Sequence, residues 1–130
     1  MGPTDLPTPG EIIATHEVIE EQYDLKYRGA RVAAPTLVLR QLLEGAEELS
    51  GEYQQGAFLL RKLITEHIFE DGNKRTAWVT TREYLQSADL RPAESGERVP
   101  HILRRIRRYD VDEIAEWLET GEIDEDRLHP

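Results

Sequence analysis

Residues 67–77 read HIFEDGNKRTA, and this stretch decides how the chain around it folds. Apolar and small residues recur at helical spacing on both sides of it. Those before it are Ala57, Leu60, Leu63 and Ile64, and those after it are Ala77, Trp78, Thr81, Tyr84 and Leu85. The spacing predicts a helix over about 53–67, a short loop, and a second helix over about 73–88. The stretch where one helix gives way to the next carries an imidazole, a carboxylate, a glycine and two adjacent cations.

The expected start of the second helix at Asn73 favours a bound anion. The first backbone N–H groups of a helix have no partner inside it and carry the positive end of its dipole. Gly72 tolerates positive φ and lets an anion approach the backbone, while Lys74 and Arg75 suit phosphate oxygens. Cations at a helix N-terminus oppose the dipole at a cost of roughly a few tenths of a kcal/mol each, so two of them there call for an anion.

Two further side chains of the stretch carry chemistry. Asp71 offers the hard oxygen that Mg²⁺ takes when the phosphates of a substrate complete its shell. His67, with an ordinary pKa of about 6.5, can take a proton from a hydroxyl group near neutral pH. Taken singly, His67 could simply end one helix and Asp71 begin the next. Together with the cations, they are the parts of a phosphoryl-transfer or nucleotidyl-transfer site.

The pattern His-x-Phe-x-Asp-Gly-Asn-Lys-Arg, from His67 to Arg75, resembles the motif of the Fic/Doc superfamily. Lys74 stands where Fic enzymes carry a second glycine, which makes the chain similar to the Doc (death-on-curing) toxin branch. The resemblance covers about residues 6–118 and implies a compact all-α bundle of about six helices. It also implies roles for single residues: His67 as general base, Asp71 as Mg²⁺ ligand, and Gly72, Asn73, Lys74 and Arg75 as binders of the nucleotide phosphates.

The resemblance implies a reaction as well. Fic enzymes transfer AMP to a protein hydroxyl, whereas in Doc-like proteins the nucleotide is thought to bind reversed, because a lysine fills the place of the second glycine. The γ-phosphate of ATP is then transferred. Doc toxins phosphorylate the elongation factor that delivers aminoacyl-tRNA (EF-Tu type) and so stop translation. A Fic-type AMP transferase, or a catalytically inactive relative that binds a nucleotide or partner, remains an alternative.

An antitoxin polypeptide is the expected partner. Self-inhibited Fic proteins carry a Ser/Thr-x-x-x-Glu-Gly/Asn helix whose glutamate blocks the nucleotide. Here the single Glu-Gly pair is Glu44-Gly45, and the residue four positions before Glu44 is Arg40. The sequence therefore shows no inhibitory motif of this kind, and inhibition is expected to come from a separate chain.

Composition limits the alternatives. The chain has 130 residues, which fits a single domain, and a net charge of −10, which argues against nucleic acid as a direct partner. A helix-turn-helix DNA reader is therefore disfavoured. Cysteine is absent and the four histidines are scattered, so a zinc site is not expected. Apolar runs fall well short of the ~20 residues of a membrane span, and the start lacks the blocks of a signal peptide, so we expect a cytoplasmic protein.

Helices are also expected over about 9–23, 36–49 and 98–108, and from Asp110 onward. Residues 24–35 break the helical pattern and suit either a short β-hairpin flap or a plain loop. Residues 1–7 and 120–130 are expected to be loose tails.

Other charged and aromatic residues have simpler explanations. His16 is expected to be a hydrogen-bonded residue at the edge of the core, with Glu20 outside, and Trp78 and Tyr84 are expected in the core. The arginines near residue 105 are expected to form a solvated face near a negative helix end, with an acidic partner as the alternative. Arg28 and Arg31 are weaker candidates for contact with the substrate.

Overall fold

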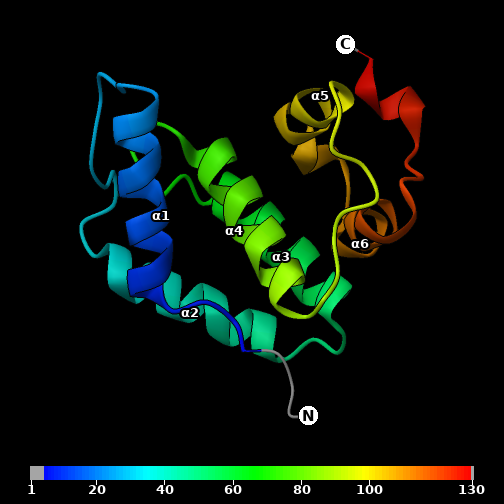
Figure 1. Ribbon diagram of the computed structural model, residues 1–130, viewed down its shortest axis with the longest axis horizontal. Coiled ribbons are helices and arrows are strands. Elements are labelled where there is room, and N and C mark those ends of the chain that lie inside the picture. Colours follow the sequence, from blue (N-terminus) through cyan, green and yellow to red (C-terminus); the bar gives the residue numbers. More distant parts are fainter. Residues whose placement is uncertain (1–4, 130) are drawn as a thin grey trace.

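Helices account for almost all regular structure in this computed structural model, which describes residues 5–129 (Figure 1). The elements are α1 (Pro9–Gln22), α2 (Pro35–Glu47), α3 (Glu52–Thr65), α4 (Asn73–Ser87), α5 (Arg98–Arg104), the 3₁₀ turn η1 (Ile106–Arg108), α6 (Val111–Thr120) and the 3₁₀ turn η2 (Glu125–Leu128). The predicted all-α bundle is confirmed. The helix expected over 98–108 is divided, because Leu103, Ile106 and Tyr109 are all buried at a spacing of three, which suits a 3₁₀ turn.

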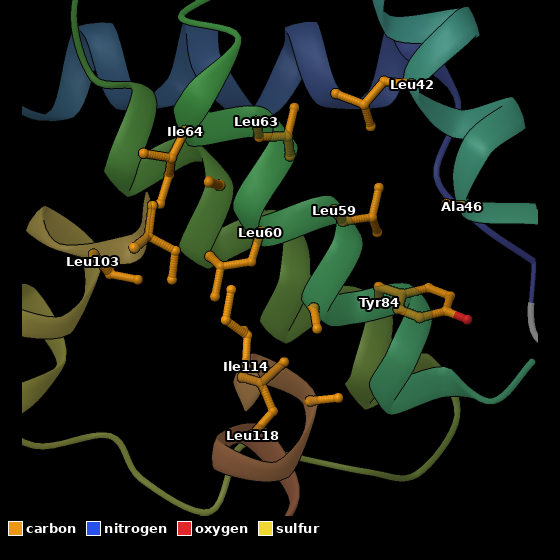
Figure 2. Close-up of a cluster of buried hydrophobic side chains, with 14 of the residues drawn as sticks. Leu42, Ala46, Leu59, Leu60, Leu63, Ile64, Tyr84, Leu103, Ile114 and Leu118 are labelled. Carbon is orange, nitrogen blue, oxygen red and sulfur yellow. The ribbon is translucent and has the colours of Figure 1, made fainter. Parts of the chain in front are cut away.

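Helix α3 lies at the centre of the bundle. It contacts α4, α6, α2 and η1, whereas α1 packs across α4 and α2 (Figure 1). The core side chains in Figure 2 show the reason, since α3 presents apolar residues to several neighbours at once: Leu59, Leu60, Leu63 and Ile64. Each such side chain contributes about 1.5–3 kcal/mol when fully buried. This packing fixes the ends of α3 and α4, between which the motif lies.

Two helices begin where local sequence predicts. At the start of α1, the Thr8 side chain accepts from the Glu11 N–H and the Glu11 carboxylate accepts from the Thr8 N–H. Asp110 and Glu113 make the same reciprocal pair at the start of α6. Such capping boxes satisfy N–H groups that the helix cannot bond.

The hairpin considered for residues 24–35 does not form. Its backbone bonds instead to the loop between α3 and α4: Ala30 forms an isolated antiparallel bridge with Phe69, and the Arg31 N–H donates to the Ile68 carbonyl over 2.7 Å. In return, the Glu70 N–H donates to the Gly29 carbonyl over 3.0 Å. A segment far away in sequence supplies the partner, so the two halves of residues 24–35 have no need to pair with each other, and the alternative of a loop without a hairpin is the one observed.

The end of the chain also differs from expectation. Residues 121–129, predicted to be loose, lie against the bundle: Ile123 and Leu128 pack on the core, and the Tyr109 hydroxyl donates to the Asp124 carbonyl over 2.8 Å. Leu6, in the other predicted tail, likewise packs on the core. Residues 1–4 and 130 of the predicted tails lie outside the described residues, and Thr120 is the last residue of α6.

The arginines around residue 105 bind backbone carbonyl groups. Arg107 donates to the Thr65 carbonyl over 3.2 Å, which ties η1 to the last turn of α3. Arg105, the residue that follows α5, donates to the His101 carbonyl in the last turn of that helix over 3.4 Å. These contacts agree with the predicted role near negative helix ends.

Within residues 5–129, no helix is both long enough and apolar enough to cross a membrane.

Candidate active site

His67 lies just beyond α3 rather than inside it. The helix ends at Thr65, and His67 adopts a left-handed conformation with φ of 51°. Histidine is among the non-glycine residues that tolerate this region, and strained positions gather at functional sites. The side chain is exposed. His67 therefore forms the corner at which the chain leaves α3, with its imidazole open to a substrate.

The buried side chain of Asn73 links the two ends of the turn from Phe69 to Asn73 by two hydrogen bonds. Its amide oxygen accepts from the Phe69 N–H over 3.0 Å, and its amide nitrogen donates to the Phe69 carbonyl over 2.8 Å. Asn73 is only 7% exposed. Its side chain is thus used within the protein, and the backbone N–H is the part of Asn73 left for a phosphate.

Gly72 is required by both backbone and packing. Its φ of 77° lies in the left-handed region, and a Cβ atom there would lie 3.0 Å from Leu25 Cδ1 and 3.4 Å from Ile19 Cγ2. The sequence predicted that the missing side chain of Gly72 leaves space for an anion. The space where a Cβ would lie is instead filled by Ile19 of α1 and by Leu25, which follows α1. Glycine at this position lets α1 press against the loop.

Asp71 is exposed beside Gly72. One carboxylate oxygen, Oδ1, accepts from the Gly72 N–H over 2.7 Å, which fixes the orientation of the side chain. In residues 5–129 there is no group of three or more His, Cys, Asp or Glu side chains that could hold a metal. A single oriented carboxylate fits Mg²⁺, which keeps several waters and takes substrate phosphates as ligands, and it does not fit an ion that needs a full protein cage.

The start of α4 has the free donors that the sequence predicts. The first N–H of the helix with a backbone partner is that of Thr76, which bonds to the Gly72 carbonyl over 2.9 Å. The N–H groups of Asn73, Lys74 and Arg75 have no acceptor among residues 5–129, and no side chain there caps the helix. Free N–H groups at the start of a helix are donors from which an anion can accept hydrogen bonds.

The two cations of the first turn are both exposed. The Arg75 guanidinium carbon lies 4.0 Å from the centroid of the Tyr23 ring, so a cation–π contact holds Arg75 against the end of α1. No carboxylate of residues 5–129 lies within 4.0 Å of the Lys74 or Arg75 charge. Their charges are therefore available to a ligand.

Helix α1 supplies two buried polar side chains near the loop, His16 and Glu20, and the sequence predicted the position of only the first. His16 is 2% exposed, as predicted for a core-edge residue, and it stacks on Phe69 with 3.8 Å between ring centroids. Its Nε2 atom lies 2.8 Å from the Asp71 carbonyl oxygen. Glu20, expected outside, is 8% exposed and accepts from the Gly29 N–H over 2.5 Å. The available signal was the spacing of four between His16 and Glu20, which places both on the face of Ile12 and Ile19.

The two weaker candidates for substrate contact, Arg28 and Arg31, differ in whether their side chains are already bound within the protein. Arg28 is held by the Glu21 carboxylate at 2.6 Å and the Asp24 carboxylate at 3.1 Å, so its charge is already neutralised. Arg31 is exposed, and only its backbone N–H is committed, to Ile68.

A model of the Fic/DOC family matches residues 7–85. The chain belongs to the Fic/DOC family. None of the curated proteins compared with the chain matches it. The matched span contains α1 to α3, the whole loop at residues 66–72 and α4 up to residue 85, so every site element described above lies inside the Fic/DOC region. Members of the Fic/DOC family are typically transferases.

Proposed function

We propose that this Fic/DOC protein is a Doc-like protein kinase that transfers the γ-phosphate of ATP to a hydroxyl group of a protein. The proposed substrate is the elongation factor that delivers aminoacyl-tRNA, so that the protein acts as a toxin that inhibits translation. The observation that supports this proposal best is the start of α4, where three unpaired N–H groups and two exposed cations follow Asp71 directly.

In the proposed reaction, His67 takes the proton of the substrate hydroxyl as its oxygen attacks the γ-phosphorus. A new oxygen–phosphorus bond forms, the bond from the γ-phosphorus to the bridging oxygen breaks, and ADP leaves with the electron pair. The N–H groups of α4 and the charges of Lys74 and Arg75 stabilise the phosphate oxygens through the transition state. Mg²⁺ held by Asp71 would neutralise phosphate charge when bound.

The choice of phosphoryl over AMP transfer depends on Lys74. A long cationic side chain stands at the second position of α4, where Fic enzymes have glycine, and it is exposed in the first turn. A lysine there occupies space and adds charge on the side from which phosphates would enter, which supports a reversed nucleotide with its γ-phosphate at the helix start.

We also propose control by an antitoxin polypeptide. Glu44 and Gly45, the one pair resembling an inhibitory motif, lie in the last turn of α2, and Glu44 is exposed. Gly45 faces the ring of Phe58 in the contact between α2 and α3. This arrangement supports restraint by a separate chain. Failure of the protein to form a complex with any polypeptide encoded beside it would count against this part of the proposal.

The test is to incubate the pure protein with ATP, Mg²⁺ and the elongation factor and to determine the mass of the factor. The gain of one phosphoryl group supports the proposal. The gain of one AMP group identifies a Fic-type AMP transferase instead, and an unchanged mass for this factor contradicts the proposed target and activity. His67→Asn serves as the control that should leave the factor unmodified.

A further inference from the structure

The loop that carries Asp71 is held from the side of α1 by a buried side chain outside the family motif. The Asp71 carbonyl oxygen can only accept a hydrogen bond, so His16 Nε2, 2.8 Å away, must carry the hydrogen. The opposite ring nitrogen, Nδ1, lies 3.7 Å from Glu20 Oε2. The imidazole thus lies between the backbone of Asp71 and the carboxylate of Glu20.

The same imidazole holds the loop by its face. It lies nearly parallel to the Phe69 ring, with an interplanar angle of 10°. Phe69 is in turn the residue whose backbone N–H and carbonyl are bonded by Asn73. One buried ring therefore contacts the five-residue turn from Phe69 to Asn73 at its first residue, Phe69, and at its middle residue, Asp71.

Glu20 extends this contact to the segment between α1 and α2. Its Oε2 atom accepts from the Gly29 N–H, and the Gly29 carbonyl accepts from the Glu70 N–H over 3.0 Å. The segment and the loop are also joined at Ala30 and Phe69. Glu20 consequently fixes the position of Gly29, whose carbonyl in turn holds Glu70 in the loop.

We infer that His16 is a positioning residue for the metal and nucleotide, with Glu20 supporting it: the His16 N–H fixes the main chain of Asp71, and so places the Asp71 carboxylate and the start of α4. The inference rests on the proposed function in that it takes Asp71 as the metal ligand. Neither side chain touches the ligand. Partners that orient a metal ligand typically change metal affinity or activity by about 10- to 100-fold when lost, because small displacements are costly.

Two variants separate the hydrogen bond from the ring. His16→Phe keeps an aromatic ring to stack on Phe69 but removes the donor to Asp71. His16→Gln keeps an amide N–H at the reach of Nε2 but removes the ring. If His16 acts through its hydrogen bond, His16→Phe impairs ligand binding and His16→Gln preserves most of it.

The measurement is the affinity of the full chain for Mn²⁺ with ADP, followed by the paramagnetic signal of Mn²⁺. Mn²⁺ takes the oxygen ligands that Mg²⁺ takes, and ADP contains no transferable γ-phosphate. We expect binding to be weakened by about 10- to 100-fold in His16→Phe and to stay near that of the parent in His16→Gln. Equal affinity in His16→Phe and the parent, or equal losses in the two variants, would overturn the inference.

A control and a second readout distinguish positioning from general destabilisation. Tyr84→Phe removes the hydroxyl that bonds to Gln55 in the core, away from the loop, and should lower the melting temperature without changing Mn²⁺–ADP affinity. Hydrogen exchange of the free protein should be faster at the Phe69 and Gly72 amides in His16→Phe than in the parent. Unchanged exchange at both amides would also overturn the inference.

The result can be separated from that of the proposed function, because Mn²⁺–ADP binding involves no group transfer. If Mn²⁺–ADP binding depends on His16 but no target is modified, the inference stands and the proposed kinase activity is contradicted. Absence of Mn²⁺–ADP binding in the parent overturns the inference, since Asp71 then holds no metal.

Discussion

His16 and Asp71 are 55 positions apart in the chain, and the Nε2 atom of His16 donates a 2.8 Å hydrogen bond to the Asp71 carbonyl. The first helix of the Fic/DOC region thereby contacts the loop that carries its motif. The contact is buried, since His16 is 2% exposed. The loop is therefore positioned by tertiary packing as well as by the helices at its two ends.

Gly72→Ala should destabilise the protein more than Gly121→Ala. Both glycines are left-handed, with φ of 77° and 83°, which costs an L-residue roughly 1–2 kcal/mol. A Cβ at Gly121 meets only Ala93 at an ordinary 3.7 Å, whereas a Cβ at Gly72 meets Leu25 at 3.0 Å. We expect a further loss of about 1–3 kcal/mol in Gly72→Ala from overpacking, measured by urea unfolding. Equal losses of unfolding free energy in the two variants would show that the Leu25 side chain moves aside without cost, and would contradict this prediction.

Asn73→Ala should lower the free energy of unfolding and abolish activity. It leaves the buried N–H and carbonyl of Phe69 without their side-chain partners, at about 1–3 kcal/mol for each unsatisfied group. Asn73→Asp keeps an acceptor for the N–H but turns a carboxylate oxygen toward the carbonyl. Its loss relative to the parent should be smaller at about pH 4, where a protonated carboxyl can donate, than at about pH 7. A pH-independent loss would contradict this geometry.

The helices could be predicted because their signals are local. Thr8 with Glu11, and Asp110 with Glu113, are capping pairs within one turn of chain, and the apolar period marks α3 and α4. The motif likewise indicated a candidate site directly, because its histidine, carboxylate and cations lie within nine residues, His67 to Arg75.

The parts that could not be predicted depend on distant partners. The helical spacing places Glu20 beside the apolar face of α1, but the Gly29 N–H that makes burial of its carboxylate acceptable is brought close only by the fold. The segment around Ala30 looked like half of a hairpin, but its partner is Phe69, which lies in another loop. The side chain of Asn73 points inward because Phe69 offers two backbone groups that need bonding.

Acid should destabilise the C-terminal half of the bundle through Glu94. The Arg98 guanidinium, with help from the Trp117 indole N–H, holds the pKa of Glu94 below its ordinary value. Because the folded-state pKa is the lower one, this stabilisation is complete above the unfolded value of about 4.3 and is lost as pH falls through the folded value.

Thermal unfolding of the parent and Glu94→Gln tests this prediction. The parent should be more stable at neutral pH, and the difference should shrink below about pH 4. Glu47→Gln, which changes an exposed carboxylate that forms no ion pair within residues 5–129, should not alter the pH dependence. A constant difference between the parent and Glu94→Gln would show that the charge of Glu94 is not the stabilising feature.

His67→Asn should remove activity and leave the fold intact. Asparagine tolerates the left-handed φ of 51° seen at His67, and the exposed side chain contributes little packing, so the free energy of unfolding should change by no more than about 0.5 kcal/mol. Asparagine cannot act as a base near neutral pH. Measured turnover should vanish while Mn²⁺–ADP binding persists, and a fully active variant would mean that another group takes the proton.

The most direct test of the central claim follows the phosphorus atoms of ATP separately. The protein is incubated with Mg²⁺, the elongation factor and ATP labelled at either the γ-phosphate or the α-phosphate, with His67→Asn in parallel. The account predicts that the γ-label alone is transferred to the factor, and only by the parent protein. Transfer of the α-label, or of the γ-label by His67→Asn as well, would contradict it.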